Sequence, residues 1–141
     1  MGVGRKIKLV ISYDGTRYQG WQVQANGPSI QEEISQAIER VTGVREIPLG
    51  SGRTDSGVHA LGQVAHFVTE SALSADTLRR ALNFHLPSDI VILDSADVPM
   101  EFHARKSAIS KLYRYVFHDG REPDIFTAAY TWRVRRRLDE K

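Results

Sequence analysis

The chain has 141 residues, of which 41% are hydrophobic and 26% charged, and its formal net charge of +2 is typical of one soluble globular domain. It contains no cysteine, which excludes disulfides, thiolate metal sites and a cysteine nucleophile. No apolar run approaches the roughly 18 residues of a membrane helix, and the N-terminus lacks the apolar stretch of a signal peptide, so we expect a cytoplasmic protein without membrane contact.

The first predicted elements are a strand and a helix. Residues 7–13 alternate between apolar and more polar positions, which predicts a strand with one face on the core. Asp14 and Gly15 end that strand. Ser29 and Glu32 form a capping box, and apolar residues at helical spacing follow it until a glycine at position 43 ends the predicted helix.

Two extended runs follow, at 47–52 and 61–69, and the stretch between them is rich in turn-forming residues. In the second run we expect His66 to lie in the core or on the sheet face. Ser74 is the expected N-cap of a second helix, which Pro87 closes.

Two more strands are predicted after the second helix. Ile90–Leu93 is a short apolar run, and Lys111–Phe117 has an aromatic residue at every second position. Tyr113 and Tyr115 lie on the same predicted face of the second strand, and we expect Tyr115 to be a core residue.

The order β-α-β-β-α-β plus one strand predicts an α+β fold of the ferredoxin-like, split βαβ type. In that fold two helices cover one face of an antiparallel sheet. The other face must meet solvent, a partner domain or a ligand.

The charge is unevenly distributed along the chain. Residues 1–101 carry 9 Lys and Arg against 12 Asp and Glu, whereas residues 102–141 carry 10 against 5. The basic end includes Arg133, Arg135, Arg136 and Arg137. Such a segment is typical of a phosphate-binding surface and also of a solvated tail, so charge alone leaves both interpretations open.

The segment most suggestive of chemistry is G-R-T-D-S-G-V-H-A-L-G-Q, residues 52–63. Its glycines predict a tight loop that carries Asp55 two residues after Arg53. A neighbouring cation favours the ionised carboxylate, which suits a nucleophile or a base. The alternative is an Asx-turn, in which the carboxylate of Asp55 bonds its own backbone and has no chemical role.

Four blocks of this sequence resemble the TruA-type tRNA pseudouridine synthases in order and spacing. The blocks are Y-D-G-T-R-Y-Q-G-W-Q at 13–22, G-R-T-D-S-G-V-H-A at 52–60, F-H-A-R-K-S-A at 102–108 and K-L-Y-R-Y at 111–115. The resemblance implies that Asp55 is the catalytic nucleophile or base. It also implies that Arg53 pairs with that carboxylate and helps to flip the target nucleotide, and that Tyr113 stacks on the target base.

The family resemblance further implies an isomerase that converts uridine to pseudouridine in the anticodon stem-loop of tRNA, at tRNA positions 38–40. It implies no cofactor and no metal, tRNA as the substrate partner, and a homodimer. Because family members continue for a second α+β half, we expect residues 1–130 to be the aspartate-bearing domain. Residues 131–141 resemble the crossover into a second domain that this chain lacks, and we expect the isolated chain to be inactive.

Other interpretations remain for several residues and for the whole chain. The five histidines lack the spacing of a zinc site. We expect His59 to bond the loop backbone and Trp21 to be a packing residue. A ferredoxin-like sheet is also compatible with a non-catalytic RNA-binding module or with an oligomerisation domain.

Overall fold

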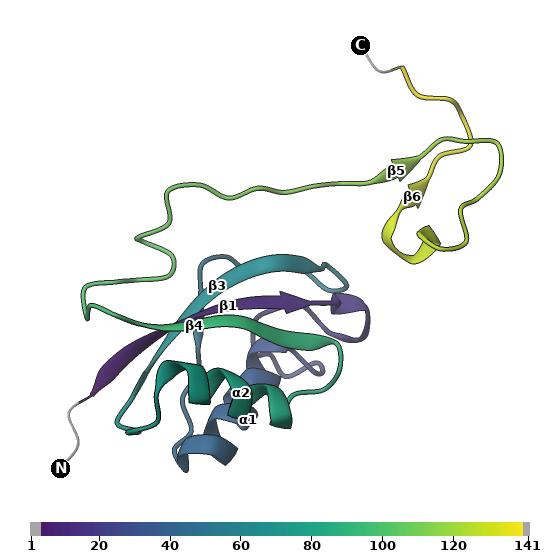
Figure 1. The fold of residues 1–141 in the computed structure, drawn as a ribbon. Coiled ribbons are helices and arrows are strands. Elements are labelled where there is room, and N and C mark those ends of the chain that lie inside the picture. The colour runs from purple at the N-terminus through teal and green to yellow at the C-terminus, as the bar shows by residue number, and fades with distance from the viewer. Residues whose placement is uncertain (1–3, 140–141) are drawn as a thin grey trace. The chain divides into compact units, whose positions relative to one another are not determined.

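A computed structural model describes residues 4–139 (Figure 1). The chain forms two compact units, Met1–Ala108 and Ile109–Lys141. Our expectation that a domain ends at residue 130 stays a prediction.

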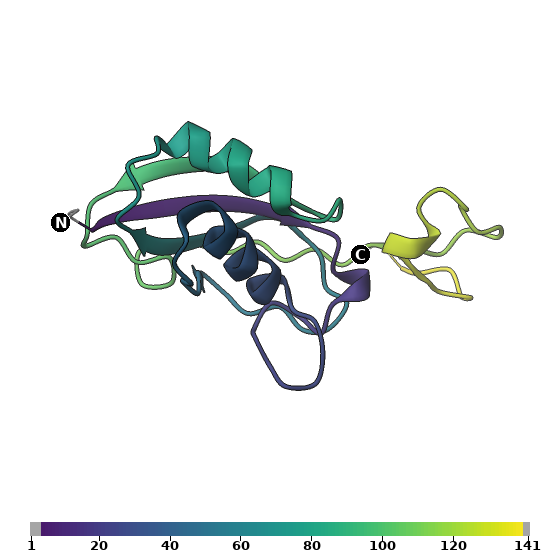
Figure 2. The ribbon, with the colours of Figure 1, turned by 90° about the horizontal axis from the view of Figure 1, so that it is seen from below.

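The first unit is a four-stranded antiparallel sheet with two helices on one face, as predicted (Figures 1 and 2). The sheet order is β2-β3-β1-β4. The elements are β1 (Arg5–Tyr13), α1 (Ile30–Thr42), β2 (Leu49–Gly50), β3 (Ala60–Thr69), α2 (Ala75–His85) and β4 (Ile90–Val98).

The core lies between the sheet and the helices. Ile7, Leu9 and Ile11 alternate along β1 and are fully buried, as are Ile34 of α1 and Leu78 of α2. Removing such side chains from water stabilises the fold by roughly 1.5–3 kcal/mol each, which is why the period-two pattern of β1 fixes the face that the helices cover.

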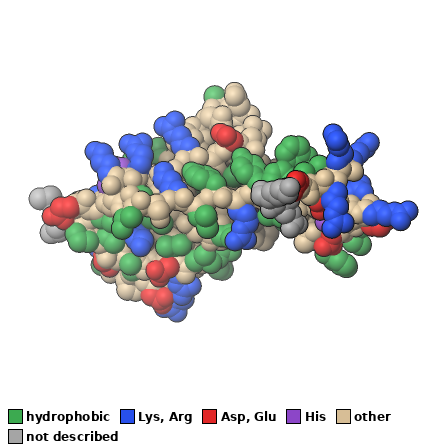
Figure 3. All heavy atoms as spheres, turned by 90° about the horizontal axis from the view of Figure 1, so that it is seen from above, with side chains coloured by type: hydrophobic (Ala, Val, Ile, Leu, Met, Phe, Trp, Pro, Cys, Tyr) green, Lys and Arg blue, Asp and Glu red, His purple; other side chains and the backbone are tan. Residues whose placement is uncertain are grey.

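The opposite face of the sheet carries no helix. Lys6 and Lys8 of β1 belong to this face by alternation with the buried positions. Figure 3 shows this side of the first unit, where Lys and Arg side chains lie at several places.

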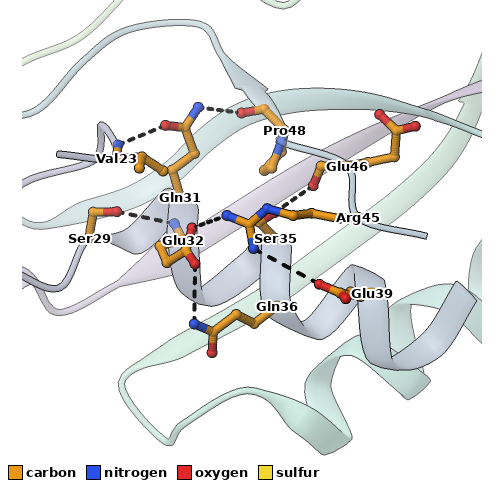
Figure 4. Close-up of polar contacts among 10 residues, drawn as sticks. All are labelled: Val23, Ser29, Gln31, Glu32, Ser35, Gln36, Glu39, Arg45, Glu46 and Pro48. Carbon is orange, nitrogen blue, oxygen red and sulfur yellow. Dashed lines mark hydrogen bonds and ion pairs between the residues drawn. The ribbon is translucent and has the colours of Figure 1, made fainter. Parts of the chain in front are cut away.

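Both predicted N-caps are present. The hydroxyl of Ser29 accepts the N–H of Glu32 at 3.1 Å, and that of Ser74 accepts the N–H of Thr77 at 3.1 Å. Glu32 does not return the bond of a capping box, because its carboxylate accepts from Arg45 at 2.6 Å (Figure 4). The hydrogen bond from Arg45 lowers the pKa of Glu32.

Two strand boundaries differ from prediction. β4 continues beyond its apolar start, because Asp94 to Val98 pair with β1 after a register shift. The shift interrupts the alternation of apolar and polar residues along β4, so the sequence pattern predicts only the first part of the strand. β2 is only two residues long, Leu49–Gly50, within the predicted run 47–52.

The predicted strand Lys111–Phe117 is wrong over most of its length. Only Phe117 is in a strand, β5 (Phe117–His118), which pairs with β6 (Trp132–Arg133). Tyr115 is 84% exposed, so it is not a core residue. The alternating pattern needs a backbone partner to become a strand, and the partner that the second unit provides is two residues long.

Neither helix in the described part of the chain, residues 4–139, has the length and apolar character that crossing a bilayer requires.

Candidate active site

The loop of residues 52–59, called the Asp55 loop below, is held by the segment that follows β1. The backbone N–H of Trp21 donates to the carbonyl of Thr54 at 3.0 Å. The hydroxyl of Thr54 lies 2.8 Å from that of Tyr13, which is buried at the end of β1. The residue just before Asp55 is therefore tied to the core by both its backbone and its side chain.

The residues after Asp55 are tied to the same segment. The carbonyl of Tyr18 accepts the backbone N–H of Gly57 at 3.3 Å and the hydroxyl of Ser56 at 3.2 Å. The Nδ1 atom of His59 accepts the N–H of Gly15 at 2.9 Å, which confirms His59 as a loop residue bonded to backbone. Bonds on both sides leave Asp55 at the turn of a fixed loop.

Two glycines allow this close contact. A Cβ atom added at Gly15 would lie 2.0 Å from the carbonyl oxygen of Val58, and one added at Gly20 would lie 2.5 Å from that of Thr54. Gly20 also has φ +91°, a conformation that residues with a Cβ atom rarely adopt. The two glycines of the first sequence block therefore let its backbone reach the Asp55 loop.

The buried Tyr18 anchors the segment that follows β1 through a second set of contacts, which do not involve the Asp55 loop. After the short 3-10 helix η1 (Gly15–Arg17), the hydroxyl of Tyr18 donates to the carboxylate of Asp89 at 2.6 Å. Arg17 pairs with the other oxygen of that carboxylate at 3.0 Å. Burial and the bond to Asp89 raise the pKa of Tyr18, so its hydroxyl stays a donor.

The carboxylate of Asp55 is exposed, and within residues 4–139 it has no hydrogen-bond or ion-pair partner. The turn at Asp55 is closed by its backbone carbonyl, which accepts the N–H of Val58 at 3.1 Å. The Asx-turn that the sequence also allowed is absent from the described loop. A fixed backbone with an unpaired carboxylate is suited to an acid, base or nucleophile.

Arg53 is exposed and forms no ion pair with Asp55 within the described residues. It lines a cavity of about 190 Å³ beside the Asp55 loop. The cavity is lined by Trp21, Gln22, Gln31, Ile47, Leu49, Gly50, Gly52, Arg53 and Arg105. Arg105 lies in the third of the four sequence blocks, but no local pattern of residues around it predicts a role.

The wall of this cavity is fixed by two buried side chains. Gln31, only 4% exposed, donates to the carbonyl of Pro48 at 2.7 Å and accepts the N–H of Val23 at 2.9 Å (Figure 4). Trp21 is 1% exposed, which confirms it as a packing residue, and its indole lies against Gly50, where an added Cβ would be 2.7 Å from Nε1.

The segment after β4 crosses the uncovered face of the sheet and brings Arg105 to the cavity. Lys6 donates to the carbonyls of Met100 and Phe102 at 2.8 and 2.6 Å. His66, buried on β3 as predicted, accepts the N–H of Ala104 at 3.0 Å. These three bonds dock the segment on the sheet.

The docking bond of His66 predicts a dependence on pH. Burial, then the charges of Lys6 and His103, lower the pKa of His66. In the unfolded chain the pKa of His66 is near 6.5, so as the pH falls this side chain takes up a proton more readily in the unfolded chain than in the folded one. The contribution of neutral His66 to the free energy of unfolding is therefore complete above about pH 6.5. It is lost as the pH falls through the lower pKa that His66 has in the folded chain.

We expect the Tm of the chain to fall by several degrees between pH 7.5 and 5, and His66→Asn to remove part of that fall. Asparagine still offers an oxygen to the N–H of Ala104 but does not titrate. His85→Asn, at the end of α2 away from the segment, is the matched control. Thermal unfolding followed by circular dichroism measures the difference, and parallel pH profiles of wild type and His66→Asn would contradict the assignment.

Tyr113 belongs to the second unit and is 67% exposed. The Asp55 loop and the cavity beside it are built from the first unit alone, so the stacking role of Tyr113 stays a prediction. Among residues 4–139, no group of three or more His, Asp or Glu side chains is arranged to hold a metal ion.

Comparison with known proteins gives a consistent result. A family model described as tRNA pseudouridine synthase matches residues 9–105, a stretch that contains Arg53, Asp55 and Arg105. The chain is 47% identical to tRNA pseudouridine synthase A of Acetivibrio thermocellus over 135 residues, which cover 96% of this chain and 55% of that protein.

Two further proteins of the same name are similarly related. The one from Moorella thermoacetica is 44% identical over 94% of this chain and 55% of its own length. The one from Ruminiclostridium cellulolyticum is 51% identical over 82% of this chain and 47% of its own length. The chain therefore spans about half the length of the curated relatives it matches.

Proposed function

The chain belongs to the tRNA pseudouridine synthase family, and on that premise we propose that it forms the aspartate-bearing part of an enzyme that converts uridine to pseudouridine. The proposed substrate is the anticodon stem-loop of tRNA, at tRNA positions 38–40. The observation that carries the proposal is the exposed carboxylate of Asp55, unpaired in the described chain and set on a backbone that is bonded on both sides.

The reaction explains why a carboxylate is sufficient. The bond between ribose C1′ and uracil N1 breaks, a bond between C1′ and C5 forms, the hydrogen on C5 leaves as a proton and N1 gains one. Atoms and electrons balance without an oxidant, reductant or co-reactant. Asp55 acts either by adding to the nucleoside or by removing a ribose proton so that the base detaches.

The uridine must leave the RNA stack before Asp55 can reach it, at a cost of about a few kcal/mol. In the proposed mechanism Arg53 approaches the Asp55 carboxylate when RNA is bound, keeps it ionised and helps to hold the nucleotide in the extruded position. Tyr113 stacks on the released base, which offsets part of the cost of unstacking.

A second half, supplied by the rest of a longer protein, completes the pocket in this proposal. The support is the length comparison, since the matched relatives extend over nearly twice the matched region. We further propose that the complete protein is a cytoplasmic homodimer that binds tRNA with both subunits.

We expect the 141-residue chain alone to show no detectable turnover, because a uridine held on one side only stays solvated and poorly oriented, and orientation supplies much of the lowering of a barrier. tRNA carrying tritium on uracil C5 reports the reaction directly, since that hydrogen is released. The chain is assayed alone and together with a separately expressed second half taken from a matched relative.

Tritium release should need both halves. Release by the chain alone, at a rate comparable to that of the two halves together, would show that the active site is self-contained and that the proposed second half is unnecessary.

A further inference from the structure

The cavity beside the Asp55 loop is cationic and its charges are uncompensated. Arg53 and Arg105 come from segments far apart in the sequence and line the same space. Neither guanidinium has an ion pair or a side-chain hydrogen bond within the described residues. No Asp or Glu is among the residues that line the cavity.

The backbone that carries Arg105 is fixed in a turn. The N–H groups of Arg105 and Lys106 donate to Nδ1 of His103 at 3.2 and 3.1 Å, and the N–H of Ser107 donates to the carbonyl of His103 at 2.8 Å. Ala104, just before Arg105, is bonded to His66 as described above. The arginine therefore reaches the cavity from an ordered support, not from a free tail.

A third donor lines the same cavity. Trp21 lines it, and the indole N–H of this residue makes no hydrogen bond within the described chain. Two guanidiniums and an indole N–H are all donors, so the chemistry of the cavity selects an oxyanion.

The size of the cavity restricts the anion. Its volume of about 190 Å³ is below the roughly 300–1,000 Å³ of pockets that enclose whole small molecules. A single phosphate group with a few waters fits this volume better than a nucleotide does. Arginine also matches the geometry of phosphate oxygens through paired N–H donors.

We infer that Arg105, in the cavity that Arg53 also lines, binds one phosphodiester group of an RNA strand, next to the nucleotide that Asp55 engages. The inference rests on the proposed function, because Arg53 lies two residues from Asp55 on the same loop. Arg105 is then a substrate-positioning residue. It fixes the strand so that the target nucleotide lies over the carboxylate.

The test is equilibrium binding of the 141-residue chain to a fluorescently labelled anticodon stem-loop RNA, followed by anisotropy at several salt concentrations. Arg105→Ala should weaken binding by about tenfold and reduce the slope of log K against log salt by about one. Lys106→Ala is the matched control, since it removes the same charge from the next residue, which does not line the cavity. It should weaken binding less than threefold.

A second arm identifies the phosphate. RNAs in which one linkage at a time is replaced by an uncharged methylphosphonate are bound to wild type and to Arg105→Ala. One linkage, next to the target uridine, should weaken binding to wild type and leave the affinity of Arg105→Ala nearly unchanged.

Equal losses from Arg105→Ala and Lys106→Ala would overturn the site, as would a methylphosphonate scan without any linkage specific to Arg105. Arg105→Ala should keep the unfolding midpoint of wild type, because its side chain bonds nothing in the described chain. Binding is measured without turnover, so failure of the Asp55 assignment and failure of this site give different results.

Discussion

Asp55→Asn should reduce pseudouridine formation by about a thousandfold or more, which is about 4 kcal/mol of transition-state stabilisation, in the protein that joins this chain to its proposed second half. Asparagine keeps the size of the side chain but can neither add to a nucleoside nor accept a ribose proton. The carboxylate bonds nothing in the described chain, so the substitution should leave the fold and its unfolding midpoint unchanged.

Tritium release from C5-labelled tRNA measures the loss. Asp94→Asn is the matched control, because Asp94 is an exposed carboxylate on β4 that also lacks a partner in the described residues. It should keep full turnover. If Asp55→Asn keeps a tenth of the wild-type rate, Asp55 is not the catalytic group, and a non-catalytic RNA-binding module becomes the better interpretation of the chain.

Gly20→Ala should destabilise the chain by about 3–5 kcal/mol, because two independent costs act at one residue. The first is φ +91°, which costs a residue with a Cβ atom about 1–2 kcal/mol. The second is overlap with the backbone, since the new Cβ would lie 2.5 Å from the carbonyl oxygen of Thr54. Neither backbone can retreat without breaking the bond between Trp21 and Thr54.

Gly43→Ala separates the two costs. Gly43 has φ +79° at the end of α1, but an added Cβ meets nothing within 4 Å, so this variant should lose only about 1–2 kcal/mol. Urea unfolding at one pH gives both values. Equal losses of unfolding free energy from the two variants would mean that the Asp55 loop shifts easily to accommodate the new Cβ atom. Gly20 would then not position the loop.

The sheet and both helices could be predicted because their patterns are local. Ser29 and Ser74 cap their helices as the sequence indicated, and β1 buries the apolar face of its alternation. Asp55 could be identified as a candidate from the glycine-rich loop, and the resemblance to a known family gave it a role.

The rest depended on contacts that local patterns do not encode. The alternation of Lys111–Phe117 is as regular as that of β1, yet it lacks a partner strand of matching length. Arg105 gained a candidate role only when Lys6 and His66 were seen to dock its segment beside the Asp55 loop. Asp89 gave no signal at all, because its bond to Tyr18 joins residues 71 positions apart.

The hydrogen bonds around Gly20 also affect how the backbone amide hydrogens of the Asp55 loop exchange with solvent. The carbonyls of Gly20 and Trp21 accept the first N–H groups of α1, from Ile30 and Gln31, while the N–H of Trp21 bonds the loop. Because these bonds join the loop to the start of the helix, we expect the two to open together as one cooperative unit. The carboxylate of Asp55 is therefore carried by a fixed backbone, and in the proposed reaction the target nucleotide must move out of the RNA stack to reach it.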